Sequence, residues 1–555
     1  MVINEKCLNK KNAFKYKEFA IKLVTLFFFV GCAKGEYRIN QDELVNFYKK
    51  NDYKSAKKIT TNKNFLPEKE NILLKNLEQG NAYLYNNNAC SALHFYNKAN
   101  QVATDQQTKS IKDGLKTTIT EEDGIYYGQT YERSLLNFYT SLANYKIYES
   151  GICDQSEIKE EQGKKENNKK DINDNKKLND DTNDENNKIQ DKNDKSKIKQ
   201  LSEQEKTSFL RASRANILFW DSWIKGRKIE KNDRMYSDDL LLKLWGAFIH
   251  EQINTTADLQ IAKQLYKDAQ NVAKNRYVVY RDFNNQNRSF IDKIDDKLQR
   301  EKNIEKDNTY TKDIIEYTNR QIQRINKKQN ANLAIIIHDD VISLKKTEKS
   351  ISPVGVGALA LVPNATLMSS VLGINTLEYE KPVIQEKNLD YKYYYSFWKN
   401  DKKIIEKPLV LAEPISNIAY ENLQEKINGI ILSTQAKVAK QVAIALGTSY
   451  ATYIGMSAID ETLGQISALG VYLGYSKIIQ NAGIIDTRQW VSLPSNIFMA
   501  LDNISSGKYK LQIVRRKNAI NQPVDKGIVN AKQEELVYSK DIEITDKTTF
   551  VDIRL

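Results

Sequence analysis

Apolar side chains recur at helical spacing through the first half of the chain, in two blocks at residues 40–150 and 207–325. The clearest stripe lies in the segment SLLNFYTSLANYKIY, where large apolar residues follow an i, i+3, i+4, i+7 pattern. This spacing places them on one face of an α-helix. The pattern therefore predicts an all-helical first half, with these residues in its core: Leu135, Phe138, Tyr139, Leu142 and Tyr145.

Each helical block also contains the spacing of small and aromatic residues that is typical of a tetratricopeptide repeat. Small residues let two antiparallel helices approach, and aromatic rings fill the gaps between neighbours. Stacked repeats build extended surfaces that bind partners. We expect tetratricopeptide-like blocks at residues 32–153 and 207–325, with generic helical hairpins as the alternative, and these packing residues: Gly80, Tyr83, Ala92, Tyr96, Ala99, Trp245, Gly246, Ala262, Tyr266 and Ala269.

Between the two blocks, residues 154–206 are rich in Lys, Asn and Asp and contain almost no apolar residue. Such a segment cannot bury enough apolar surface to offset the entropy of ordering it. We therefore expect a disordered insertion.

The pattern changes near residue 326, where short apolar runs replace the helical stripes. The runs NLAIIIHDDVISLKK, VGVGALALVP and KYYYSFWKN predict strands. The segment after Pro414 predicts a helix, with a break near Asn428 and Gly429. Close to the end of the chain, Ser506 and Gly507 predict a turn between two strands.

One later segment, residues 448–475, is apolar and rich in glycine but contains Asp460 and Glu461. The two carboxylates favour a buried helix over a membrane span. The predicted fold class is thus α+β, with N-terminal tetratricopeptide-like α-helical hairpins followed by a C-terminal mixed α/β domain at residues 326–555 that ends in a β-rich tail.

The first 31 residues have the layout of a signal peptide. A lysine-rich lead-in precedes an apolar run from Leu23 to Val30, which is far shorter than the roughly 20 residues of a membrane-spanning helix. Such a run fits the apolar region of a signal peptide, which is removed from the mature protein. We therefore exclude residues 1–31 from the fold.

The run ends in Phe29-Val30-Gly31-Cys32, which resembles a bacterial lipobox. In that motif the cysteine is acylated and becomes the first residue, and two or three acyl chains anchor a protein firmly. Cys32 is thus the predicted lipidation site; the alternatives are an ordinary secretory signal with a chance cysteine and a misassigned start. Because Ala33 follows instead of Asp, the sorting rule of Gram-negative lipoproteins favours the outer membrane, facing the periplasm, over the inner membrane.

The formal net charge is +13, which raises the question of nucleic-acid binding. The charges are mixed in sign, and no basic stripe is interleaved with aromatic residues. We therefore expect no nucleic-acid partner. The four cysteines are too few for a disulfide framework or a metal cluster, and Cys90 and Cys153 are either packed thiols or a bridge formed in an oxidising compartment.

Catalytic motifs are missing from the sequence: it contains no G-x-S-x-G, no H-E-x-x-H and no phosphate loop. His338 precedes Asp339 and Asp340, but neighbours on a strand point to opposite faces, so this is a poor chelate. Asp460 and Glu461 fit a loop between helices better than an acid–base pair. We predict no catalytic residue, no metal site and no cofactor.

Two segments, PISNIAYENLQEKINGIILSTQAKVAKQVA and DTRQWVSLPSNIFMALDNISSGKYKLQI, carry a family resemblance. The chain resembles uncharacterised bacterial lipoproteins that join tetratricopeptide-like helices to a C-terminal α/β part, over most of its length outside residues 154–206. The family's D-T-R-x-W-x-x-L-P signature and glycine-containing hairpin correspond to Asp486, Thr487, Arg488, Trp490, Leu493, Pro494 and Gly507. The resemblance implies an outer-membrane lipoprotein and no reaction, and we expect Asp486 and Arg488 to form a structural ion pair.

Together these features predict a non-enzymatic, lipid-anchored periplasmic protein that acts as an interaction scaffold in the cell envelope. Its partners would be envelope proteins, and its N-terminal acyl chains would hold it on the membrane. One alternative is an enzyme acting on cell-wall polymer near Asp486 and Arg488 or near Asp460 and Glu461. Another is a structural subunit of an export or assembly machine.

Overall fold

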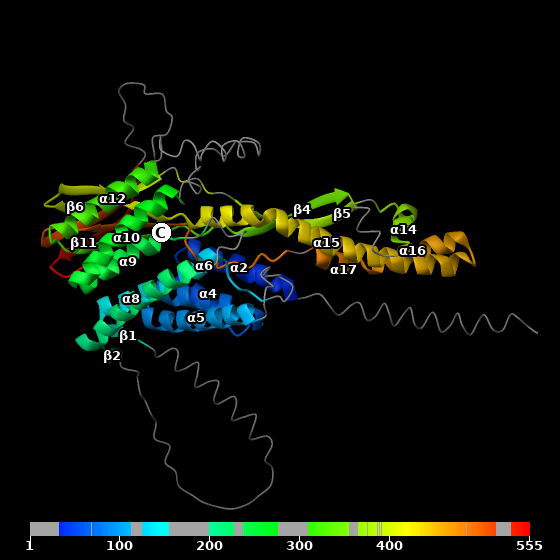
Figure 1. Cartoon of the computed structure of the whole chain (residues 1–555), viewed down its shortest axis with the longest axis horizontal. Coiled ribbons are helices and arrows are strands. Elements are labelled where there is room, and N and C mark those ends of the chain that lie inside the picture. The colour runs from blue at the N-terminus through cyan, green and yellow to red at the C-terminus, as the bar shows by residue number, and fades with distance from the viewer. Residues whose placement is uncertain are drawn as a thin grey trace, which may run out of the picture. The chain divides into compact units, whose positions relative to one another are not determined.

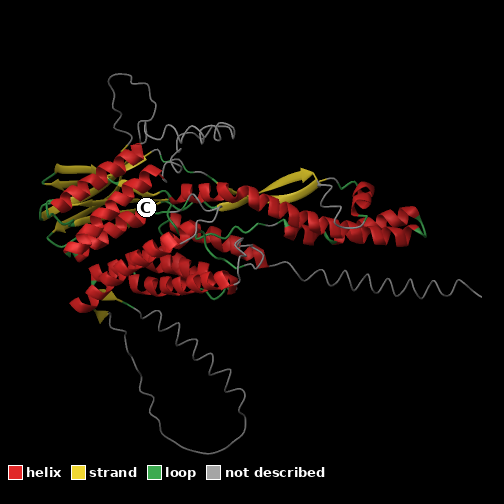
Figure 2. Cartoon of the chain, in the orientation of Figure 1, coloured by secondary structure: helices red, strands yellow, loops and turns green. Residues whose placement is uncertain are grey.

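The computed structural model describes residues 33–112, 125–154, 199–226, 236–275, 309–353, 364–517 and 534–555, apart from positions 68, 237, 375, 386, 388, 390 and 484. These residues form two compact units (Figure 1, Figure 2). The helix–sheet unit comprises the described residues within 43–344, 385–422 and 489–555, and the hairpin unit comprises those within 33–42, 345–384 and 423–488. Neither unit has a boundary at residue 326, where the sequence places the start of a C-terminal domain.

Helices form the first part of the helix–sheet unit. After α2 (Ala33–Lys49), the chain continues through α3 (Tyr53–Thr60), the short 3₁₀ helix η2 (Lys69–Asn71), α4 (Ile72–Tyr85), α5 (Ala89–Lys112), α6 (Thr130–Ser150), α8 (Glu203–Gly226), α9 (Leu240–Ile253), α10 (Thr256–Asn275) and α12 (Thr309–Asn326). Two-residue strands β1 (Ile152–Cys153) and β2 (Lys199–Gln200) pair between α6 and α8.

The helical hairpins α4/α5 and α9/α10 contain all the predicted packing residues, and every one of them is buried. A Cβ added at Gly80 would lie 2.3 Å from Cε1 of Tyr96 on the partner helix. At Gly246 the nearest atom would be Cγ2 of Ile217 in α8, at 2.8 Å. Glycine is therefore required at both positions for the helices to approach this closely.

Two four-stranded sheets complete the helix–sheet unit. The first has the order β12-β3-β9-β8 and the second β11-β10-β6-β7. Only the β12–β3 pair among them is parallel. Their bounds are β3 (Leu333–Asp339), β6 (Tyr391–Lys399), β7 (Lys402–Pro408), β8 (Val410–Glu413), β9 (Asn496–Asp502), β10 (Gly507–Lys517), β11 (Glu534–Ile544) and β12 (Thr549–Arg554).

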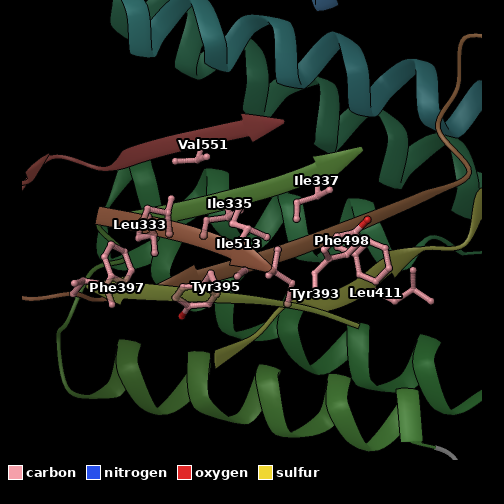
Figure 3. Close-up of a cluster of buried hydrophobic side chains, with 14 of the residues drawn as sticks. Leu333, Ile335, Ile337, Tyr393, Tyr395, Phe397, Leu411, Phe498, Ile513 and Val551 are labelled. Atoms are coloured by element: carbon pink, nitrogen blue, oxygen red, sulfur yellow. The ribbon is translucent and has the colours of Figure 1, made fainter. Parts of the chain in front are cut away.

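The two sheets pack face to face around one apolar core. Figure 3 shows their side chains pointing toward one another: Leu333, Ile335, Ile337, Tyr393, Tyr395, Phe397, Leu411, Phe498, Ile513 and Val551. The whole of β3 is buried, because the helices cover the face of the first sheet that points away from the second. This two-sided burial explains why β3 is a continuous apolar run instead of an alternating one.

Aromatic rings connect those helices to the first sheet. Phe550 of β12 lies 5.1 Å from Tyr145 and 6.2 Å from Trp245, between ring centroids. His338 of β3 stacks on Tyr139 of α6 at 5.8 Å. The helical hairpins therefore use their apolar faces to cover a sheet, unlike repeats that stack only on one another.

The predicted turn at Gly507 does not close a hairpin. β9 pairs with β3 and β8, whereas β10 pairs with β6 and β11. The chain therefore crosses from one sheet to the other at this turn, and it crosses back between β11 and β12. The glycine-containing hairpin that the family resemblance implies is corrected accordingly.

The hairpin unit contains a two-stranded antiparallel sheet and a set of helices. Its elements are β4 (Lys345–Pro353), α14 (Ala365–Leu372), β5 (Thr376–Ile384), α15 (Ile415–Ser457), whose first residues belong to the helix–sheet unit, α16 (Glu461–Gly474) and α17 (Ser476–Ala482). Its core is formed by Ala365, Met368, Leu377, Tyr379, Val438, Ala439, Val442, Ala443, Leu446 and Ala468.

Helix α15 runs without interruption through Asn428 and Gly429, so the predicted break is wrong. One glycine inside a helix costs only about 1 kcal/mol relative to alanine, which packing elsewhere along a long helix offsets. The α+β fold class is confirmed.

Several predicted segments lie outside the described residues: the signal peptide with Cys32, the run VGVGALALVP and residues 155–198 of the predicted disordered insertion. The end of that insertion is ordered, because Lys199–Gln200 form β2 and α8 begins at Glu203. Ala33 likewise starts a helix.

Candidate functional site

The signature residues lie in the loop that connects α17 to β9. Trp490, Leu493 and Pro494 are buried in the helix–sheet unit. The Trp490 ring lies 5.5 Å from that of Tyr139 in α6. This part of the signature therefore anchors the loop against the helices.

Two buried carboxylates hold the backbone of the same loop, and we call them the carboxylate clamp: Glu78 of α4 and Glu132 of α6. Oε1 of Glu132 accepts from the backbone N–H of Trp490 at 2.9 Å. Oε1 of Glu78 accepts from Val491 at 2.7 Å, and its Oε2 accepts from Ser492 at 3.3 Å. The clamp satisfies backbone donors that burial removes from water.

Burial raises the pKa of Glu78 to about 8, and the nearby charge of Glu132 adds to the rise. The bonds from Val491 and Ser492 act in the opposite direction but are outweighed. At neutral pH the protonated form of Glu78 therefore predominates. A carboxyl group of raised pKa occurs in catalytic acids as well as in structural sites. Both oxygens of Glu78 accept hydrogen bonds from the loop backbone, which is the arrangement of a structural site.

Asp486 and Arg488 form the predicted ion pair, with Nη2 of Arg488 2.5 Å from Oδ2 of Asp486. The backbone N–H of Arg488 also donates to Oδ1 of Asp486, at 2.8 Å. Burial alone would raise the pKa of Asp486, but Arg488 holds it below its ordinary value. The carboxylate of Asp486 and the guanidinium of Arg488 therefore bind each other within one tight turn.

His338 is fully buried and belongs to a polar network between β3, β12 and the helices. Its Nε2 lies 2.9 Å from Oδ1 of Asp552, and Oδ2 of Asp552 accepts from Nζ of Lys146 at 2.7 Å. The hydroxyls of Tyr85 and Tyr139 each lie 3.3 Å from its Nδ1. His338 is therefore not a partner of Asp339 or Asp340, as the strand geometry predicts.

The pKa directions fix the charges in this network. Burial lowers the pKa of His338, so the imidazole is neutral, donates from Nε2 and accepts at Nδ1. Burial alone would raise the pKa of Asp552, but Lys146 and His338 hold it far below its ordinary range. The network is a largely buried ion pair beside a neutral histidine.

Cys90 and Cys153 are joined by a disulfide bond, with their Cα atoms 5.1 Å apart. The bond ties the start of α5 to β1 beside a small apolar cluster that includes Ile147 and Leu201. Disulfides persist in oxidising compartments.

Within the described ranges, no group of three or more His, Cys, Asp or Glu side chains is placed to hold a metal ion. His250 instead bonds Asp258, with Nδ1 2.7 Å from Oδ1. Arg214 donates to the same oxygen at 3.1 Å.

A pocket of about 200 Å³ lies between α12, the last residues of β9, and strands β6 and β7 of the second sheet. Three of its lining cations pair with carboxylates: Arg324 with Glu251 at 2.5 Å, Lys407 with Asp502 at 2.5 Å, and Arg320 with Glu316 at 2.7 Å. Neither Asp486 with Arg488 nor Asp460 with Glu461, the two pairs considered for cell-wall chemistry, lines this pocket.

Asp460 lies in the turn between α15 and α16, where its Oδ1 accepts from the backbone N–H of Leu463 at 2.9 Å and caps α16. This is the predicted loop position. The predicted burial of the surrounding helix is wrong, because only Gly464 and Ala468 of α16 are buried. Large aliphatic side chains are exposed around the turn and along α16: Ile454, Ile459, Leu463, Ile466, Leu469 and Leu473.

Sequence reasoning does not single out the clamp residues Glu78 and Glu132, nor Lys146 and Asp552. Each is a charged residue in a segment that otherwise reads as amphipathic, and its partner lies hundreds of positions away along the chain. The one local signal is Glu132, which also accepts from the backbone N–H of Gln129 as part of a capping box.

Among the described helices, none combines the length and the apolar character needed to cross a membrane. Comparisons of the chain with family models, curated proteins and solved structures gave no match. The resemblance to uncharacterised lipoproteins therefore stays a prediction from the quoted motifs.

Proposed function

We propose that the chain is a non-enzymatic, acyl-anchored scaffold protein of the bacterial envelope, in which the helix–sheet unit is a rigid base and the hairpin unit contacts another envelope component. The observation that carries this proposal is the exposed aliphatic surface around α16. Contiguous exposed apolar surface on a folded protein marks a site of interaction. The lipobox at Cys32 and the disulfide support the location.

We assign the contact with the envelope component to the hairpin unit instead of the tetratricopeptide-like blocks, for a physical reason. In the helix–sheet unit, apolar helix faces are already covered by the first sheet, as the contact of Trp245 with Phe550 illustrates. No specific observation favours the enzyme alternative, because Asp486 and Arg488 bind each other and Asp460 caps a helix.

Photo-crosslinking in cells tests the contact. A photoreactive residue at Leu463 should capture an envelope component, whereas one at Leu536, an exposed leucine of the helix–sheet unit, should not. Equal capture at both positions, or none at either, contradicts the proposal. A single stable complex of high mass would instead favour a subunit of an assembly machine.

Metabolic labelling with a lipid analogue tests the anchor independently. Wild-type protein should incorporate the label, and Cys32→Ser should abolish it. Persistent labelling of Cys32→Ser would refute the lipobox.

A further inference from the structure

The outward face of α16 carries large apolar side chains that are exposed. Its buried residues, Gly464 and Ala468, are small. On the opposite side, Leu463, Ile466, Leu469 and Leu473 are 39, 64, 43 and 58% exposed. With 3.6 residues per turn, these four side chains lie within an arc of about 120°.

This arrangement of small and large side chains is the reverse of that in a helix packed on the core of a water-soluble protein. A soluble helix turns its large apolar residues inward, whereas helices in lipid place small residues at helix contacts and large aliphatic ones outward. A Cβ at Gly464 would lie 2.1 Å from Oγ of Ser457 at the end of α15. The small residue thus lets the two helices meet, and the large ones face out.

Charge points to the same environment. Between Lys440 and Lys477 the only charged residues are Asp460 and Glu461, both at the turn. The two lysines lie at the opposite end of the hairpin, where cations suit the phosphates of lipid headgroups.

The composition of the face favours lipid as the envelope component that the hairpin unit contacts. Protein interfaces are enriched in Tyr, Trp, Met and Arg, but the exposed large side chains of α16 are all Leu or Ile. The nearby Tyr450, Tyr453 and Tyr472 pack against the core of the hairpin unit. An uncharged face whose large exposed side chains are all aliphatic matches lipid hydrocarbon.

We infer that α16 inserts its outward face into the interfacial layer of a lipid bilayer and lies along the membrane surface, with Asp460 among the headgroups. The inference rests on the proposed function, because the acylated Cys32 would bring the hairpin unit to a membrane. A second copy of the chain or a helix of a partner protein could also cover this face. The experiment distinguishes lipid from these two alternatives.

The test measures membrane depth in the acylated, full-length mature protein, reconstituted into phosphatidylcholine vesicles. Under the proposed function wild type has no free thiol, because Cys7 leaves with the signal, Cys32 is acylated and Cys90 is bonded to Cys153. A thiol-reactive fluorophore on Ile466→Cys should brighten several-fold, shift to the blue and be quenched by nitroxide-labelled lipids. The matched control, Leu536→Cys, is 54% exposed in the helix–sheet unit and should remain unquenched.

A second substitution shows whether the face itself is responsible. Adding Leu473→Glu should remove the lipid quenching of the probe at position 466, whereas adding Leu536→Glu should leave it. A probe at 466 that lipid quenchers do not reach overturns the inference, whether the protein is monomeric or dimeric. If mass spectrometry finds the fluorophore on Cys32 of wild type, that thiol is not acylated. This result contradicts the proposed anchor and does not bear on the lipid contact of α16.

Discussion

Glu78 shows how a single buried carboxyl group makes folding depend on pH. Its pKa is about 8 in the folded protein and close to the ordinary glutamate value once the chain unfolds. The folded state therefore binds a proton that the unfolded state has released, between about pH 4.5 and pH 8. The stabilisation is fully present below the lower value and is lost as the pH rises through the higher one.

We predict that Glu78→Gln removes this dependence. Glutamine resembles the protonated carboxyl group, so the free energy of unfolding of the variant should stay level where that of wild type falls by about 1.4 kcal/mol per pH unit. Urea unfolding between pH 5 and pH 9 measures the difference. The exposed Glu43→Gln should keep the wild-type profile, and parallel profiles for wild type and Glu78→Gln would contradict the assignment.

Close approach of two helices is the main feature at the scale of the element. Gly80→Ala would place a Cβ 2.3 Å from the ring of Tyr96, which forces the α4/α5 hairpin apart. We expect a loss of about 1–3 kcal/mol in the free energy of unfolding. Gly470→Ala in α16 is the matched control, since nothing lies within 4 Å of its Cβ position; it should be neutral or stabilise by up to about 1 kcal/mol.

The disulfide between α5 and β1 makes a second prediction at this scale. It closes a loop between residues 63 positions apart, and a loop of that length corresponds to about 4 kcal/mol in the chain-entropy account. The double variant Cys90→Ser/Cys153→Ser should lose a comparable amount, measured by thermal and urea unfolding. Dithiothreitol should destabilise wild type and leave the double variant unchanged; equal sensitivity of the two would argue against the bond.

Whether a segment forms a helix or a strand follows from its local sequence pattern. Which other elements it pairs or packs with does not. The spacing of Gly80 and Tyr96 predicts close helix packing, and the run before His338 predicts a buried strand, because these signals lie within a few residues. The hairpin expected at Gly507 fails because pairing of β9 and β10 with other strands is decided by distant segments. Helix α16 misleads for another reason: apolar residues all round a helix indicate burial but do not say whether protein or lipid provides it.

Long-range contacts dominate at the scale of the whole molecule. Lys146 and Asp552 pair across 406 positions, and Glu78 reaches Val491 across 413. Removing one partner of a largely buried ion pair leaves the other charge uncompensated. The helices and the first sheet should therefore lose stability together.

We predict that Asp552→Asn lowers the free energy of unfolding by about 3 kcal/mol. Hydrogen exchange should quicken in α6 as well as in β3 and β12, although α6 is far from the substitution along the chain. The exposed Asp546→Asn, in the turn before β12, should change stability by less than about 0.5 kcal/mol. Faster exchange confined to β12 would show that the strand is only loosely coupled to the helices.

The parallel pairing of β3 with β12 has a consequence for timing. During synthesis or export, the helices emerge long before the strand that completes the sheet beneath them. Until then, the rings of Tyr145 and Trp245 lack the covering that Phe550 provides. Contacts of such high sequence separation form slowly. We therefore expect the rings of Tyr145 and Trp245 to stay exposed until β12 has emerged and paired with β3.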